Sequence, residues 1–332
     1  MITMTHYLSG SRLDGQIQLE NSEICFLRTR LFEAETQVQS LDEELEPPEI
    51  HVFTKAPRLG QLRIDEADGG NQGVTILGSL VLPWNQLTDL HAAFDYASAR
   101  SLYMDMFARF KNLVYLTLSS MHTPSASNDH PIIMPNLKSL DLSSAHPSYV
   151  RHITAPVLEH LALYYLDNQS FVADVLSFHN RSSTALLSLA ITAPLYAGSH
   201  FLSKSFLAIL PAFFTVKLLK MFYGKVEYAC DDPDINATLK ALSYVEGRSI
   251  LLPNLVSFEY HQNWRYHRDS RYCPLELVPM VLSRRIPNQP AATGETRIQR
   301  LQKVVLDFRL EEETKQIVGI PGLELVYSER NF

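Results

Sequence analysis

The chain has 332 residues, of which 46% are hydrophobic and 20% charged, and its formal net charge is −7 at pH 7. This acidic balance argues against nucleic acid as the main partner, because phosphate binding needs a basic surface. Three cysteines without paired spacing argue against a disulfide scaffold. The most apolar stretch, 201–222, contains lysines and a proline, so we expect no membrane span and an intracellular protein, cytoplasmic or nuclear.

The sequence pattern of residues 1–55 predicts a tail, a helix and a linker. Residues 1–20 are mostly polar and unpatterned, which indicates a disordered tail. Residues 21–46 carry apolar residues at alternating steps of 3 and 4, a heptad pattern that predicts a coiled-coil-like helix. Pro47 and Pro48 would end this helix, and residues 47–55 read as a linker. The helix could form a homodimer through 21–46 or pack on its own chain, and both alternatives stay open.

From residue 56 onward one short phrase recurs, in which apolar residues occupy the first, fourth and sixth positions. The nine copies begin at Leu59, Leu87, Leu113, Leu137, Leu158, Leu186, Phe213, Leu255 and Leu301. Most of the intervals fall between 21 and 28 residues, a period typical of leucine-rich repeats. Each copy predicts a short strand whose apolar side chains enter the core.

The segments between the copies predict helices, because apolar residues recur there at helical spacing. The expected helices cover Tyr96–Phe110, Ser170–Phe178, Phe201–Leu210, Asp234–Val245 and Leu275–Leu282. Strands and helices in alternation indicate an α/β leucine-rich-repeat solenoid over 56–332, with a curved parallel sheet and helices on its convex side. Leu323 and Leu325 would form a last strand in a C-terminal cap.

A solenoid of this kind usually binds proteins on its concave face, where the polar strand positions lie. We take eight of these positions as candidate partner-binding residues: Arg63, His91, Tyr115, His160, Tyr164, Lys217, Glu259 and His261. Tyr115, His160 and Tyr164 could form an aromatic contact patch. The alternative, that all eight are ordinary solvated strand residues, stays open.

No motif in the chain predicts catalysis. The histidines lack metal-ligand spacing, and neither a phosphate-binding loop nor a nucleophile elbow is present. We therefore expect a non-enzymatic protein with no cofactor and no metal site. Trp264–Arg268 mixes basic and aromatic residues as single-strand nucleic-acid binders do, but a surface loop is the interpretation we adopt, with no nucleic-acid partner.

Several phrases resemble the large F-box and leucine-rich-repeat family of mushroom-forming fungi. They are Leu82–Leu90, Phe110–Val114, Leu251–Leu255 and Leu275–Arg285, and their order along the chain resembles the family's order. The resemblance implies the substrate-recognition part of a ubiquitin ligase. Glu46–Ile50 is similar only to the opening of the family's F-box, and the helices that would bind the ligase adaptor have no room before the first repeat.

Two functional hypotheses follow. In the first, the repeats bind a protein substrate, and the ligase adaptor joins only if a fuller isoform supplies the F-box. In the second, the chain is a scaffold or decoy that dimerises through 21–46 and joins no ligase.

Overall fold

The computed structural model describes residues 2–7, 24–30, 59–67, 83–93, 107–120, 131–164, 170–193, 202–224, 233–263, 273–285, 298–307 and 313–328. The chain divides into two units, residues 1–157 and 158–332, which we describe separately. The predicted linker 47–55, most of the expected helix at Tyr96–Phe110 and the segment Trp264–Arg268 lie outside the described residues.

The first unit is built on a parallel sheet. Its strands, in spatial order, are β1 (Ile2–Tyr7), β2 (Ile24–Arg30), β3 (Gln61–Ala67), β4 (Asp89–Ala93), β5 (Tyr115–Ser120) and β7 (Ser139–Ala145). A second, two-stranded parallel ladder joins β6 (Ile132–Ile133) to β8 (Ile153–Thr154), and the 3₁₀ helix η2 (Pro147–His152) precedes β8. Every strand of the main sheet thus pairs with its neighbours in chain order, as repeats of one unit would.

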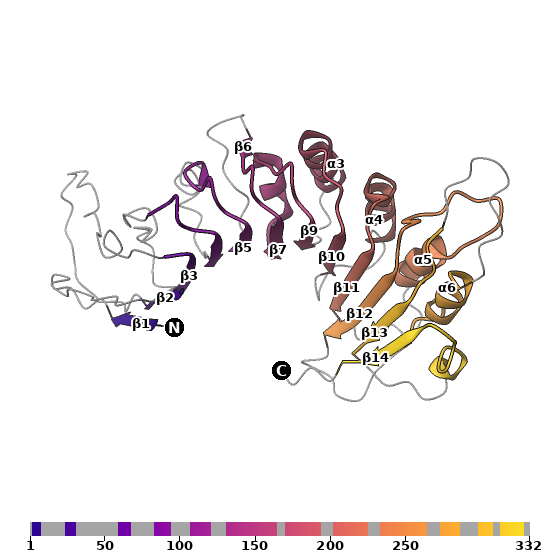
Figure 1. The fold of residues 1–332 in the computed structure, drawn as a ribbon. Helices are drawn as coiled ribbons and strands as arrows, with labels where there is room; N and C mark the ends of the chain where they lie inside the picture. Colours follow the sequence, from indigo (N-terminus) through magenta and orange to yellow (C-terminus); the bar gives the residue numbers. More distant parts are fainter. Residues whose placement is uncertain are drawn as a thin grey trace. The chain divides into compact units, whose positions relative to one another are not determined.

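The second unit combines a parallel sheet with helices. Its strands, in chain and spatial order, are β9 (His160–Tyr164), β10 (Ser188–Ala193), β11 (Leu218–Gly224), β12 (Ser257–Asn263), β13 (Lys303–Leu306) and β14 (Glu324–Tyr327). The connections contain α3 (Ser170–Ser182), α4 (Leu202–Ile209), η4 (Leu210–Phe213), α5 (Pro233–Leu242), α6 (Leu277–Ser283) and η5 (Glu313–Gln316). Helices α3 to α6 lie on one side of this sheet (Figure 1), because a parallel strand needs a crossover connection to reach its neighbour.

The apolar phrase forms the core as the sequence predicts. Its first position is no more than 1% exposed at Leu59, Leu87, Leu113, Leu137, Leu158, Leu186, Leu255 and Leu301, and in the remaining repeat Val216 takes the place predicted for Phe213 and is equally buried. Within a strand the burial alternates, so that Leu161 and Leu163 of β9 are buried while His160 is exposed. Removal of these side chains from water supplies the main driving force for stacking one repeat on the next.

A repeated hydrogen-bond pattern joins each repeat to the next. The carbonyl of Gly60 accepts two backbone bonds, from the N–H of Thr88 at 2.8 Å and of Asp89 at 3.1 Å. The same two-donor arrangement recurs at the carbonyls of Thr88, Val114, Glu159, Leu187, Lys217 and Val256. Because one carbonyl fixes two successive amides, the register of each strand is set at the point where it enters the sheet.

Asparagine side chains reinforce the turns that enter the strands. Each donates from Nδ2 to a backbone carbonyl of the preceding repeat: Asn112 to Asn85 at 2.7 Å, Asn136 to Lys111 at 3.0 Å and Asn254 to Phe214 at 2.9 Å. These carbonyls lie in turns and have no strand partner on that side. The amide therefore satisfies a backbone group that would otherwise depend on water.

A buried arginine joins three segments of the second unit. Arg284 follows α6 and is 2% exposed. Its Nε donates to the carbonyl of Leu242 at 2.6 Å, its Nη1 to that of Leu252 at 2.9 Å, and its Nη2 to that of Leu251. Burial lowers the pKa of Arg284 to about 10. The planar guanidinium thus connects the end of α5 and the loop before β12 to α6.

The α/β class and the parallel sheet that the repeats predict are confirmed, and so are the helices expected at 170–178, 201–210, 234–245 and 275–282, which correspond to α3, α4, α5 and α6. The strand expected around Leu323 and Leu325 is β14. Within the described residues no helix is long and apolar enough to span a membrane.

Two predictions for the N-terminal part are wrong. Residues 2–7 form β1, although a disordered tail was expected over 1–20, and residues 24–30 form β2, although a heptad helix was expected over 21–46. Strand β2 pairs with β1 and β3, and sheet pairing of this kind overrides the local helical pattern. Residues 31–46 lie outside the described residues. The proposed homodimer through 21–46 therefore loses the first part of the helix on which it depended.

Candidate functional site

Each sheet has one face that is opposite the buried apolar positions, and we call it the open face. In the first unit it includes Arg63 on β3, His91 on β4 and Tyr115 on β5. Arg63 pairs in register with His91, and His91 with Thr117, so these residues form one row across three strands. Tyr115 lies in the neighbouring row, next to Asp89.

The surroundings of these two rows are partly buried. Tyr115 is 51% exposed and is available to a partner. Burial raises the pKa of Asp89 above its ordinary value, and the adjacent His91 opposes part of that rise. Asp141, at the end of the Arg63 row, accepts a 2.8 Å hydrogen bond from the backbone N–H of Ser143. The two neighbouring rows therefore combine an exposed contact residue, Tyr115, with side chains that are partly buried or bonded to the strands.

In the second unit the open face includes His160 and Tyr164 on β9, and Glu259 and His261 on β12. The side chain of His160 is 50% exposed and lies 3.9 Å from Glu159, which is itself well exposed, so this pair contributes little to stability. Burial raises the pKa of Tyr164 above its ordinary value. Tyr115 belongs to the first unit, so the aromatic patch that would join it to His160 and Tyr164 stays a prediction.

The predicted position of Lys217 on the open face is wrong. Lys217 precedes β11, and Lys220 is the residue that pairs in register with Ala190 and with Glu259. The phrase in this repeat begins at Val216 rather than at Phe213, which ends the 3₁₀ helix η4. The strand is therefore shifted by three residues from the predicted register, and Lys220 takes the place that was assigned to Lys217.

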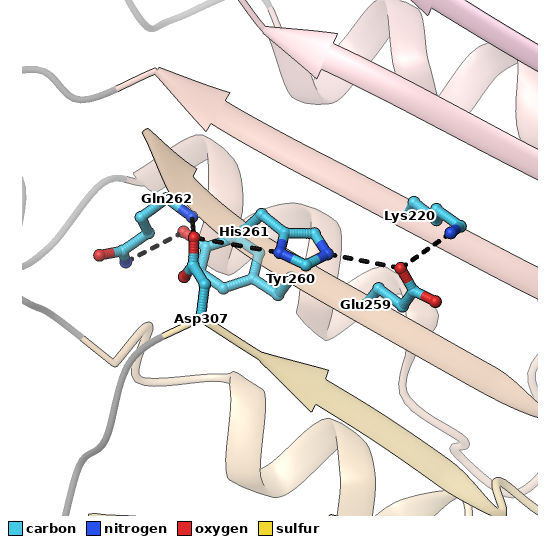
Figure 2. A network of polar contacts seen from close by, with 6 residues as sticks. All are labelled: Lys220, Glu259, Tyr260, His261, Gln262 and Asp307. Atoms are coloured by element: carbon cyan, nitrogen blue, oxygen red, sulfur yellow. Dashed lines mark hydrogen bonds and ion pairs between the residues drawn. The ribbon is translucent and has the colours of Figure 1, made fainter. Parts of the chain in front are cut away.

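Figure 2 shows the cluster that this shift brings together, which we call the β11–β13 charge cluster: Lys220, Glu259, His261 and Asp307. The Nζ of Lys220 lies 3.0 Å from Oε2 of Glu259. The same oxygen lies 3.4 Å from Nε2 of His261, and Nδ1 of His261 lies 3.9 Å from Oδ2 of Asp307. Four charged or titratable side chains from three neighbouring strands thus follow one another across the sheet.

The cluster becomes more buried along its length. Lys220 retains 32% side-chain exposure and Glu259 15%, whereas His261 has 5% and Asp307 has 3%. Phe222 of β11 stacks on the ring of His261, with ring centroids 4.8 Å apart and an interplanar angle of 12°. Only the lysine end of the cluster is open to a large partner.

Neighbouring polar groups orient the buried end. Oδ2 of Asp307 accepts a 2.7 Å hydrogen bond from the backbone N–H of Gln262, and Nε2 of Gln262 lies 3.4 Å from the hydroxyl of Tyr260 (Figure 2). Asp307 directly follows β13 and lies beside His261, because Tyr260 pairs with Leu306. Asp307 was not among the predicted site residues. Its position in the repeat could have indicated it. Asp307 directly follows Leu306, the third apolar residue of its repeat, as His261 directly follows Tyr260.

The geometry restricts what the β11–β13 charge cluster can do chemically. Both ring nitrogens of His261 face carboxylates and the ring is 5% exposed, so neither nitrogen is presented to a substrate as a general base. In the described part of the chain, no group of three histidine, cysteine, aspartate or glutamate residues is arranged to hold a metal ion. The arrangement instead pairs opposite charges between neighbouring strands of the sheet.

Comparison with known proteins gives no relative: no protein-family model, no curated protein and no solved structure matches the chain.

Proposed function

We propose that the chain is a leucine-rich-repeat protein that binds another protein on the open face of its strands, without catalysis. The observation that carries the proposal is the recurrence of one strand-entry geometry, in which a single carbonyl accepts two amides from the next repeat. Repeats built alike present their polar positions in straight rows. Such rows form a broad, preorganised surface of the kind that solenoids use for recognition.

The chemistry of the open face supports recognition of a protein. In the first unit this face offers an exposed tyrosine at position 115, and in the second unit a half-exposed histidine at 160 and a partly exposed lysine at 220. A tyrosine on a rigid strand offers a large contact area at a low cost in conformational entropy, because it has only two side-chain torsions. In the second unit the helices cover the opposite side of the sheet (Figure 1). These helices therefore do not cover the open face.

The resemblance to fungal F-box and leucine-rich-repeat proteins refines the proposal. On that basis the bound protein is a substrate that is presented for ubiquitin ligation, and an F-box in a fuller isoform would bind the ligase adaptor. A pull-down with the purified adaptor subunit tests this refinement. Lack of binding would reject the ligase role for this chain and leave partner binding on the open face untouched.

Site-specific photo-crosslinking in the native cell extract tests partner binding itself. A photoreactive phenylalanine at position 160 probes the open face, and the same residue at position 245 provides the matched control. Val245 is also half exposed and lies in the connection after α5, outside the sheet. We expect a crosslinked adduct of defined mass from position 160 and none from position 245.

Equal crosslinking from both positions would mean that the open face has no special role. A defined adduct from position 245 alone would place recognition on the connections instead. Either result would refute the proposal, and a Tyr115 replacement in the first unit repeats the test at a second exposed position.

A further inference from the structure

The two ring nitrogens of His261 face two different carboxylates. Nε2 lies 3.4 Å from Oε2 of Glu259, and Nδ1 lies 3.9 Å from Oδ2 of Asp307. A neutral imidazole has one N–H and one lone pair. In either neutral tautomer a lone pair would therefore face a carboxylate at close range. Only the imidazolium, which carries an N–H on both nitrogens, is attracted at both positions.

The charge balance of the cluster leads to the same state. The ammonium of Lys220, from β11, lies 3.0 Å from Glu259 and compensates that carboxylate. Asp307, which follows β13, is 3% exposed and receives a backbone N–H from Gln262. Protonation of His261 places a positive charge beside the buried carboxylate of Asp307, which matters because a buried charge is costly unless it is paired.

A stacked aromatic ring also favours the charged form. Phe222 of β11 stacks on His261 at a centroid distance of 4.8 Å, and an aromatic face attracts a cation more strongly than a neutral ring. His261 thus contacts Phe222 on β11, Glu259 on its own strand and Asp307 after β13, and Lys220 on β11 lies on the far side of Glu259.

We infer that His261 carries a proton in the folded protein near neutral pH, and that this charge holds β12 to β13 as a pH-dependent latch. The latch is independent of the proposed partner binding, because it acts within the sheet. An unfolded histidine loses its proton at about pH 6.5, whereas the folded protein would keep it. The stabilisation is then complete below about pH 6.5 and is lost as the pH rises and His261 releases its proton in the folded state. Over that range the unfolding equilibrium constant rises by up to about tenfold per pH unit for one proton.

The charge state can be observed directly in the full-length chain. Two-bond ¹H–¹⁵N spectra of protein labelled with ¹⁵N-histidine distinguish imidazolium from each neutral tautomer, and the His261 signal is assigned as the one altered in Asp307→Asn. We expect the imidazolium pattern for His261 at pH 7. A neutral pattern at pH 7 would overturn the inference.

The pH dependence of unfolding gives the second test. Urea unfolding of the wild type, His261→Gln and His160→Gln is compared between pH 6 and pH 8.5. The wild type and His160→Gln should lose stability as the pH rises, and His261→Gln should lose the smaller part that does not depend on the latch. His160 is the matched control, because it lies on the same face of the same unit but is half exposed. An unchanged pH dependence in His261→Gln would overturn the latch.

Discussion

The shifted register of β11 makes a quantitative prediction about Lys220 and Glu259. Their Nζ and Oε2 atoms lie 3.0 Å apart, and the two side chains are 32% and 15% exposed. With an effective dielectric constant of about 20, the attraction would reach about 5 kcal/mol. Solvent screening of the partly exposed lysine and the entropy of ordering both side chains reduce this figure. We expect a coupling free energy of about 1 kcal/mol.

A double-mutant cycle measures this coupling. Lys220→Ala, Glu259→Ala and the double variant are unfolded in urea at pH 7 and low salt, and the free energies of unfolding are compared with that of the wild type. The matched cycle uses Lys217→Ala with the same glutamate variant. Lys217 is an exposed lysine three residues earlier, which binds the sheet through its backbone. Its coupling to Glu259 should stay within about 0.3–0.5 kcal/mol of zero.

A coupling of similar size in both cycles, or a coupling confined to Lys217, would contradict the pairing of Lys220 with Glu259. The first outcome would show that the lysines act only through the general field of the sheet. The second would restore the register that begins at Phe213, and Lys220 would then leave the open face. Higher salt should weaken the true coupling, because the lysine end is open to counterions.

Further predictions follow from the core, the buried arginine and a strand carboxylate. Leu140→Ala should lower the free energy of unfolding in urea by about 2–5 kcal/mol, because Leu140 is fully buried. Ser139→Ala, on the open face, should change it by less than about 0.5 kcal/mol. Equal losses in the two variants would contradict the strand register. Arg284→Met should cost about 3–5 kcal/mol, because buried carbonyls lose their charged donor. The same replacement at the exposed Arg248 is the control, and a neutral result at Arg284 would show that water replaces the guanidinium. The raised pKa of Asp89 means that its ionised form destabilises the fold, so Asp89→Asn should raise the urea midpoint at pH 7. This gain should disappear on acidification below its ordinary value of 3.8, where the carboxyl is protonated in both states, and a gain that is independent of pH would refute burial as its cause.

The apolar phrase was sufficient to predict most strands of both sheets. Burial at its first, fourth and sixth positions needs only a strand of period two and a tight entry turn, and both are local properties. The helices α3 to α6 were predictable for the same reason, since their apolar spacing is that of a helix that packs on one side. The row of Arg63 and His91 on the open face followed from this alternation without further information.

The sequence was ambiguous where an apolar stretch fits two patterns. Between Phe213 and Met221 the phrase can begin at Phe213 or at Val216, and the hydrogen bonds to β10 select the second. Residues 24–30 fit a heptad helix and also a strand of Ile24-Cys25-Phe26-Leu27. Pairing with β3 selects the strand, because the backbone of residues 24–30 forms hydrogen bonds with a strand distant in sequence. Such a partner is not visible in the local pattern.

The order of residues alone predicts an α/β protein with parallel strands and which side chains enter the core, because both depend on periodicity along the chain. The β11–β13 charge cluster depended on the tertiary structure alone. Its members come from positions 220, 259, 261 and 307, and only the hydrogen-bonded register of the strands brings each member within 4 Å of the next. Charges separated by tens of residues acquire their partners when the sheet forms, since the strength of an ion pair depends on distance and burial, which the order of residues does not contain.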